Sequence, residues 1–265
     1  MQPTFTYAPT SSDVIHRNYY SVDSMLKNDY QRSLSFSGEA MEMIHTILAR
    51  PQEGEAPTEP TTSSSSLFLR SVPLPALPAS SGVNEGAVAL FQNALVVEAT
   101  HLQRSNGHGH GALERSQNVA LAGVLLYNTG LCHHMQALSH MTTTCSSSLK
   151  PVAPASSSTT TDLLCKAHKM YTMAMSLLHM EPAPEHHQDE QALLTLAIMN
   201  NMAHIYTCFA DLTSAAQCVE YMNELLETTT LCGAVDEPQL AEDCIFFSMT
   251  CTLFLRNSFV AASAA

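Results

Sequence analysis

The stretch Leu193–Leu226 constrains the fold most, because it contains two helical patterns separated by only a few residues. In its first part, residues recur at steps of three and four, the spacing of one helix face: Leu194, Ala197, Ile198, Asn201, Ile205 and Cys208. The second part repeats this spacing at Ala215, Val219, Met222 and Leu226. Asp211 and Thr213 stand between the two, and such side chains accept hydrogen bonds from the free N–H groups at a helix start. The short connection predicts two antiparallel helices in contact.

Three further segments show the same helical spacing. One stripe follows Ser116 and consists of Leu121, Val124, Leu125, Asn128, Leu131, Met135 and Leu138. A second follows Asp162, a candidate N-cap, and consists of Leu164, Ala167, Tyr171, Ala174 and Leu178. The last begins near Asp236 and Pro238 and consists of Leu240, Cys244, Phe247, Cys251, Phe254 and Leu255. This final helix is apolar around much of its circumference, so we expect it to be largely buried.

The rest of the chain divides by composition. Residues 1–37 are polar and carry no sustained period, which predicts a disordered segment. We expect residues 38–112 to contain a short helix, a Pro/Ser-rich linker and a β-hairpin, although 87–100 fits a strand or a buried helix equally well. Residues 113–258 form the predicted helical-repeat domain, with a Ser/Thr-rich disordered insertion at 142–161 and a tail at 259–265.

Composition excludes several classes of protein. The 265 residues carry 24 acidic and only 11 basic side chains, a net charge of -13, which disfavours binding to a nucleic-acid backbone. We find no secretory signal pattern and no apolar run of about 18 residues, so we expect no membrane partner and a soluble intracellular protein, in cytoplasm or nucleus. No CxxC pair occurs, and six cysteines fall within helical patterns, where we expect them to be small buried apolar groups: Cys132, Cys165, Cys208, Cys218, Cys244 and Cys251.

The two best helix pairs resemble the tetratricopeptide repeat family. The matches are a small residue in each first helix, an aromatic one turn later, and an Ala-containing second helix: Gly130, Ala203, Tyr206, Ala167, Tyr171, Ala174 and Ala215. The resemblance implies a mainly α fold of antiparallel hairpins stacked as in these repeats, here with a small N-terminal β-hairpin and disordered insertions. Ala167 and Ala215 are farther apart than the family's period of about 34 residues, so the chain departs from the regular repeat that forms a peptide groove.

A narrower resemblance is to a group of uncharacterised diatom proteins. It covers roughly residues 67–265 and rests on a strand-like region, an Asn-x-Gly motif, an Asn-Asn motif and an Ala-rich end: Phe91–Leu95, Asn128–Gly130, Asn200–Asn201 and Ala261–Ala265.

Asn128, Asn200, Asn201 and Tyr206 are the candidate binding residues. On an inner helix face, an Asn amide can both donate to and accept from the backbone of an extended peptide. The alternative is that these amides bond a neighbouring helix or loop of the same chain. We therefore predict a non-enzymatic scaffold or adaptor that binds a protein or peptide partner, with no catalytic residue, cofactor or metal.

The thirteen histidines suggest an alternative, a His/Cys-dependent metal-binding protein or hydrolase. Cys132 and His133 are adjacent, but neighbours on a helix point about 100° apart, which favours a buried thiol over a catalytic pair. His133 and His134 diverge for the same reason, and a metal site needs three or four converging ligands. No GxSxG elbow and no phosphate-binding glycine motif occur in the sequence.

Overall fold

The computed structural model describes residues 8–50, 67–76, 88–99, 115–146, 155–180, 188–228 and 238–263. Within these ranges the chain forms seven helices and two strands, in the order α1 (Ser11–Leu26), α2 (Tyr30–Leu48), β1 (Leu67–Pro73), β2 (Asn93–Ala99), α3 (Arg115–Ser146), α4 (Ala155–Met180), α5 (Gln188–Cys208), α6 (Leu212–Thr228) and α7 (Pro238–Ser263). The prediction of a mainly α fold with a small β-hairpin is confirmed.

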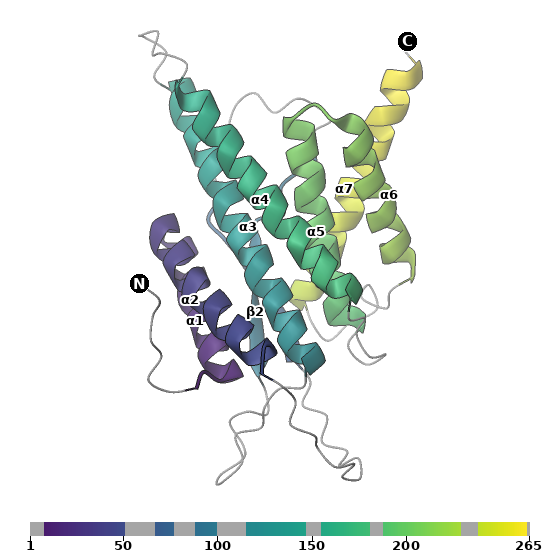
Figure 1. Cartoon of the computed structure of the whole chain (residues 1–265). Helices are drawn as coiled ribbons and strands as arrows, with labels where there is room; N and C mark the ends of the chain where they lie inside the picture. The colour runs from purple at the N-terminus through teal and green to yellow at the C-terminus, as the bar shows by residue number, and fades with distance from the viewer. Residues whose placement is uncertain are drawn as a thin grey trace.

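The helices form successive pairs packed side by side (Figure 1). The pairs α1/α2, α3/α4 and α5/α6 each share a long interface, and α2 also packs on α3, α4 on α5, and α6 on α7. The two helices predicted within Leu193–Leu226 are α5 and α6, joined by a turn at residues 209–211. Apart from the exposed Cys208, the predicted stripes lie in or against the core, which runs from α1 to α7 as one cluster of buried side chains.

The β-hairpin lies against the helical layer. β1 and β2 are antiparallel, with Leu67 opposite Ala99 and Pro73 opposite Asn93. β2 packs against α1 and α3, whereas β1 contacts α7. The open assignment of residues 87–100 is therefore resolved as a strand at Asn93–Ala99, preceded by an extended segment whose Val88, Leu90 and Phe91 are buried. The hairpin is thus part of the core.

The prediction of disorder for residues 1–37 is wrong for residues 11–37, which form α1 and the first half of α2; residues 1–7 lie outside the described residues. Thr10 and Asp13 form a capping box at the start of α1, and the Asp29 carboxylate accepts from the backbone N–H of Arg32 at the start of α2. The helices meet through small polar groups, because the Ser21 hydroxyl lies 2.9 Å from that of Ser33 and 2.8 Å from that of Ser37. All three serines are buried. Val14, Val22 and Met25 of α1 are also buried at helical spacing, so an apolar stripe was present, and the many polar residues around it led to the wrong prediction.

Helix ends differ from prediction elsewhere as well. The insertion 142–161 is helical at both ends, because α3 continues to Ser146 and α4 begins at Ala155. Asp162 therefore lies inside α4 and is not its N-cap. The tail 259–265 is helical as far as Ser263. Most of the predicted linker and of the loops between helices lies outside the described residues.

Two burial predictions fail in part. Cys132, Cys218, Cys244 and Cys251 are buried as expected, but Cys165 and Cys208 are exposed, because they lie on the outer faces of their helices. Helix α7 buries only one face: Cys244, Phe247, Cys251 and Phe254 are covered, whereas Ile245, Met249 and Leu253 are more than half exposed.

Gly130 fixes how closely α3 approaches α4. A Cβ at this position would lie 2.7 Å from Cε1 and 2.9 Å from Cδ1 of Tyr171. The Tyr171 ring is fully buried and cannot retreat into solvent. The small residue expected from the repeat-like pattern is therefore required by packing.

We predict that Gly130→Ala destabilises the protein. Overpacking costs about 1–3 kcal/mol, which exceeds the gain of up to about 1 kcal/mol from the better helix former. Gly38→Ala is the matched control, because α2 leaves open space around Gly38, and there the substitution should stabilise by up to about 1 kcal/mol. Urea unfolding of both variants measures the difference; equal effects would contradict the packing role of Gly130.

Candidate functional site

Four buried asparagines form a row along the inner helices and hold the backbone of one extended segment. We call Asn18 of α1, Asn128 of α3, and Asn200 and Asn201 of α5 the amide ladder; each is at most 1% exposed. The segment that they hold is residues 88–95, which belongs to this same chain. The ladder therefore connects three helix pairs through one strand.

Asn128 binds Leu95 in the manner of a neighbouring strand. Its Oδ1 accepts from the Leu95 N–H at 2.9 Å, and its Nδ2 donates to the Leu95 carbonyl at 2.7 Å. Asn18 donates to the same carbonyl at 3.1 Å, and its own Oδ1 accepts from Asn128 at 2.9 Å. These bonds satisfy main-chain groups of β2 that do not pair with β1.

Asn201 makes the same pair of hydrogen bonds to Phe91, four residues before Leu95. Its Oδ1 accepts from the Phe91 N–H at 3.0 Å, and its Nδ2 donates to the Phe91 carbonyl at 3.2 Å. Asn200 donates to the Ala89 carbonyl at 2.8 Å. The hydroxyl of Tyr127 donates to the Asn93 carbonyl at 2.8 Å, so a tyrosine continues the row.

The ladder is not a free binding surface. Val88, Leu90, Phe91 and Leu95 of this segment are buried, and each such side chain contributes about 1.5–3 kcal/mol. Releasing the segment would therefore cost on the order of 10 kcal/mol, comparable to the whole stability of a typical domain. The expectation that Asn128, Asn200 and Asn201 face a partner needs correction: the chain's own strand occupies them, as the alternative interpretation allowed.

Asn18 is the member of the ladder that sequence reasoning missed. It lies in the segment predicted to be disordered, and its side chain reaches Leu95, 77 residues further along the chain. No local pattern marks such a contact. Two local signals of α1 were available: the Thr10 and Asp13 cap, and the helical spacing of Val14, Val22 and Met25 on the same face as Asn18.

His134 and His204 form a second buried polar contact, between α3 and α5. His134 Nε2 lies 3.0 Å from His204 Nδ1, and the Cys208 Sγ lies 3.7 Å from that same Nδ1. Burial lowers the pKa of His134 well below its usual value, and His204 lowers it further. Burial lowers the pKa of His204 to about 4. Both rings are therefore neutral at pH 7.

These groups are not arranged around a common point. The two ring nitrogens face one another directly, which leaves no place for an ion between them. Across the described ranges, no group of three or more His, Cys, Asp or Glu side chains could hold a metal ion. His108, His110, His186 and His187 lie outside the described residues. Cys132 is buried and donates to the Tyr30 carbonyl at 3.4 Å, and burial raises the pKa of its thiol to about 12.

Comparison with protein-family models, curated proteins and solved structures gives no match. The resemblance to tetratricopeptide repeats therefore rests on the residues of this chain alone. Within the part of the chain that the structure describes, no helix is both long and apolar enough to span a membrane.

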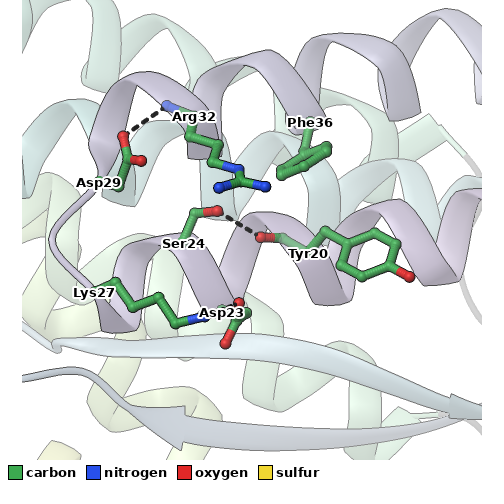
Figure 2. Close-up of a pocket in the computed structure, with 7 residues that line it drawn as sticks. All are labelled: Tyr20, Asp23, Ser24, Lys27, Asp29, Arg32 and Phe36. Carbon is green, nitrogen blue, oxygen red and sulfur yellow. Dashed lines mark hydrogen bonds and ion pairs between the residues drawn. The ribbon is translucent and has the colours of Figure 1, made fainter.

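A small hollow lies between α1 and α2 (Figure 2). Its volume of about 110 Å³ is well below the range of about 300–1,000 Å³ that is usual for ligand sites. Its charges are engaged with the protein: Lys27 pairs with Asp23 at 2.6 Å, and the guanidinium of Arg32 lies 5.6 Å from the centre of the Phe36 ring. We therefore assign no ligand to this hollow.

Tyr206, the fourth candidate, lies at the outer side of α5 and remains partly exposed. Its hydroxyl lies 2.9 Å from His168 Nε2 of α4, and the two rings meet edge to face with centroids 5.3 Å apart. Of the four residues predicted from sequence, Tyr206 alone is in a position that another protein could contact.

We predict that Asn128→Leu destabilises the protein by about 2–5 kcal/mol. The substitution keeps the volume but leaves the Leu95 N–H and carbonyl with fewer partners, and each unsatisfied buried group costs about 1–3 kcal/mol. Asn223→Leu on α6 is the control, because that amide bonds only the Glu227 side chain at an exposed position; its effect should stay within about 0.5 kcal/mol. Urea unfolding measures the stability of both variants, and equal losses of stability would contradict a structural role for the amide ladder.

We predict that stability falls as the pH is lowered from about 6.5 toward 4. The pKa values of His134 and His204 lie below the ordinary value of about 6.5, so unfolding takes up protons in this window. The loss should reach about 1.4 kcal/mol per pH unit for each ring. Burial raises the pKa of Asp243, whose protonation partly opposes this trend.

His204→Gln provides the control for this pH dependence. Glutamine retains hydrogen-bonding groups but does not titrate, so the free energy of unfolding should depend less steeply on pH. Urea unfolding at pH 7, 6 and 5 measures the slope. An unchanged slope would show that other groups carry the pH dependence.

Proposed function

We propose that this chain is a non-enzymatic helical-repeat scaffold that binds another protein at the corner between α5 and α6. We call Tyr206, Phe209 and Leu212 the corner surface. Phe209 is 44% and Leu212 62% exposed, and this exposure of apolar side chains on an ordered turn carries the proposal. The repeat-like pairing of helices and the resemblance to tetratricopeptide repeats support it, because stacked hairpins commonly serve as binding surfaces.

The corner is held by its own backbone. The N–H groups of Phe209 and Asp211 both donate to the Tyr206 carbonyl, at 3.1 and 2.9 Å. Ala210 adopts the left-handed conformation with φ 58°, which completes the turn. The turn is therefore already ordered before binding, and complex formation would cost little conformational entropy at this surface.

The start of α6 closes the corner. Asp211 caps the helix: its Oδ1 accepts from the Ser214 N–H at 3.1 Å and its Oδ2 from the Ser214 hydroxyl at 2.7 Å. These hydrogen bonds lower the pKa of Asp211, so the carboxylate stays charged beside Leu212. An apolar surface with an acidic edge suits a partner segment that combines apolar and basic side chains.

We predict that the double substitution Phe209→Glu and Leu212→Glu weakens partner binding at least tenfold. Loss of two apolar contacts removes more than the roughly 1.4 kcal/mol that corresponds to a factor of ten. Met180→Glu is the control, because Met180 is 76% exposed on α4, away from the corner turn. The partner is first isolated on the immobilised full chain and identified, and its affinity for each variant is then measured by calorimetry. Native affinity in the double variant, with unchanged circular dichroism, would refute the corner surface.

A further inference from the structure

Helix α7 carries an apolar stripe that nothing in the described structure covers. Ile245, Met249 and Leu253 are 59%, 58% and 53% exposed, although the opposite face of the helix is buried against the core. Figure 1 shows α7, in yellow, passing behind the α5/α6 pair in this view, and the helix packs on α6. Four-residue steps keep the three side chains on one line along the helix. The sequence alone had predicted that this helix would be largely buried.

Two opposite charges mark the ends of the same stripe. Glu242 precedes Met249 by seven residues, Arg256 follows it by seven, and both side chains are exposed. At 3.6 residues per turn, these two charges and the three apolar residues lie within an arc of about 80°. Among the residues that the structure describes, the ion pairs involve neither charge. Ile245 and Leu253 stand four residues either side of Met249, so the stripe is symmetric about Met249 in position and antisymmetric in charge.

We propose that two copies of this chain pair through α7, antiparallel about a two-fold axis at Met249. In such a pair, residue i of one copy meets residue j of the other and the reverse also holds. Glu242 then lies opposite the Arg256 of the second copy at both ends, Ile245 lies opposite Leu253, and the two Met249 side chains meet. A parallel pair would instead place like charges together, at Glu242 and again at Arg256.

The charge pattern indicates that a second copy of this chain covers the α7 stripe. Each chain has a formal net charge of -13, so two copies repel one another in general and need a local attraction to associate. The stripe supplies it through two complementary ion pairs around an apolar centre. A shallow crossing of about 20°, as in coiled coils, keeps the charges within reach of one another at both ends. A single helix pair is a small interface, so we expect a dimer that forms in the micromolar range.

Sedimentation equilibrium of the full chain from low micromolar to near-millimolar concentration tests the pairing. Met249→Glu places two like charges on the axis and should yield monomer throughout. Met173→Glu is the matched control, because Met173 is 42% exposed on α4, and it should leave the dimer unchanged. A wild-type chain that stays monomeric, or a dimer unaffected by Met249→Glu, would overturn the proposal.

Charge exchange tests the direction of the pair. Glu242→Arg alone and Arg256→Glu alone should each raise the dissociation constant severalfold. The double exchange should restore it, and the two single variants mixed together should form a heterodimer tighter than either variant with itself. Single variants that dimerise as well as wild type would overturn the antiparallel arrangement. The stripe is a different face from the corner surface, so a monomeric result leaves the proposed partner binding untouched.

Discussion

The hydrogen bonds from buried side-chain amides to the backbone of residues 88–95 are the interaction on which the rest of the fold depends. A two-stranded hairpin is only marginally stable by itself, and β2 would leave unpaired main-chain groups on the side away from β1. Asn18 and Asn128 hydrogen-bond Leu95 on that side. Asn201 holds Phe91 in the extended segment just before β2, so three different helices fix this part of the chain. The strand gains a substitute neighbour, and the helix pairs gain a common contact that fixes their relative positions.

The helices of the C-terminal half could be predicted because their burial is apolar and local. The stripes of α3 to α6 contain residues such as Leu125, Tyr171 and Val219, whose spacing predicts which face of each helix is buried. The α1/α2 pair was missed although Val14, Val22 and Met25 are buried at helical spacing, because polar residues dominate the composition of this segment. Periodicity could have shown the buried face of α1, but it could not show the contacts among the Ser21, Ser33 and Ser37 hydroxyls that join the two helices.

For the candidate site, the sequence predicted that the asparagines bind an extended backbone, but it could not predict which segment they bind. Asn128 and Asn201 bind an extended backbone, as their residue type and their place on an inner face indicated. The bound backbone belongs to the same chain, and Asn201 and Phe91 are 110 residues apart. No pattern in one sequence states such a pairing. Helix α7 shows the converse limit, because apolar residues around a helix do not reveal which of its faces the rest of the chain covers.

The path of residues 88–95 across α1, α3 and α5 also sets how the stack comes apart. In a solenoid each unit contacts only its neighbours, so end units can fray while the others persist. Here one strand contacts the first, second and third helix pairs at once. Loss of any pair exposes part of that strand to water and weakens its hold on the other two. We therefore expect the three pairs to unfold as a single cooperative unit, although they are arranged as successive pairs.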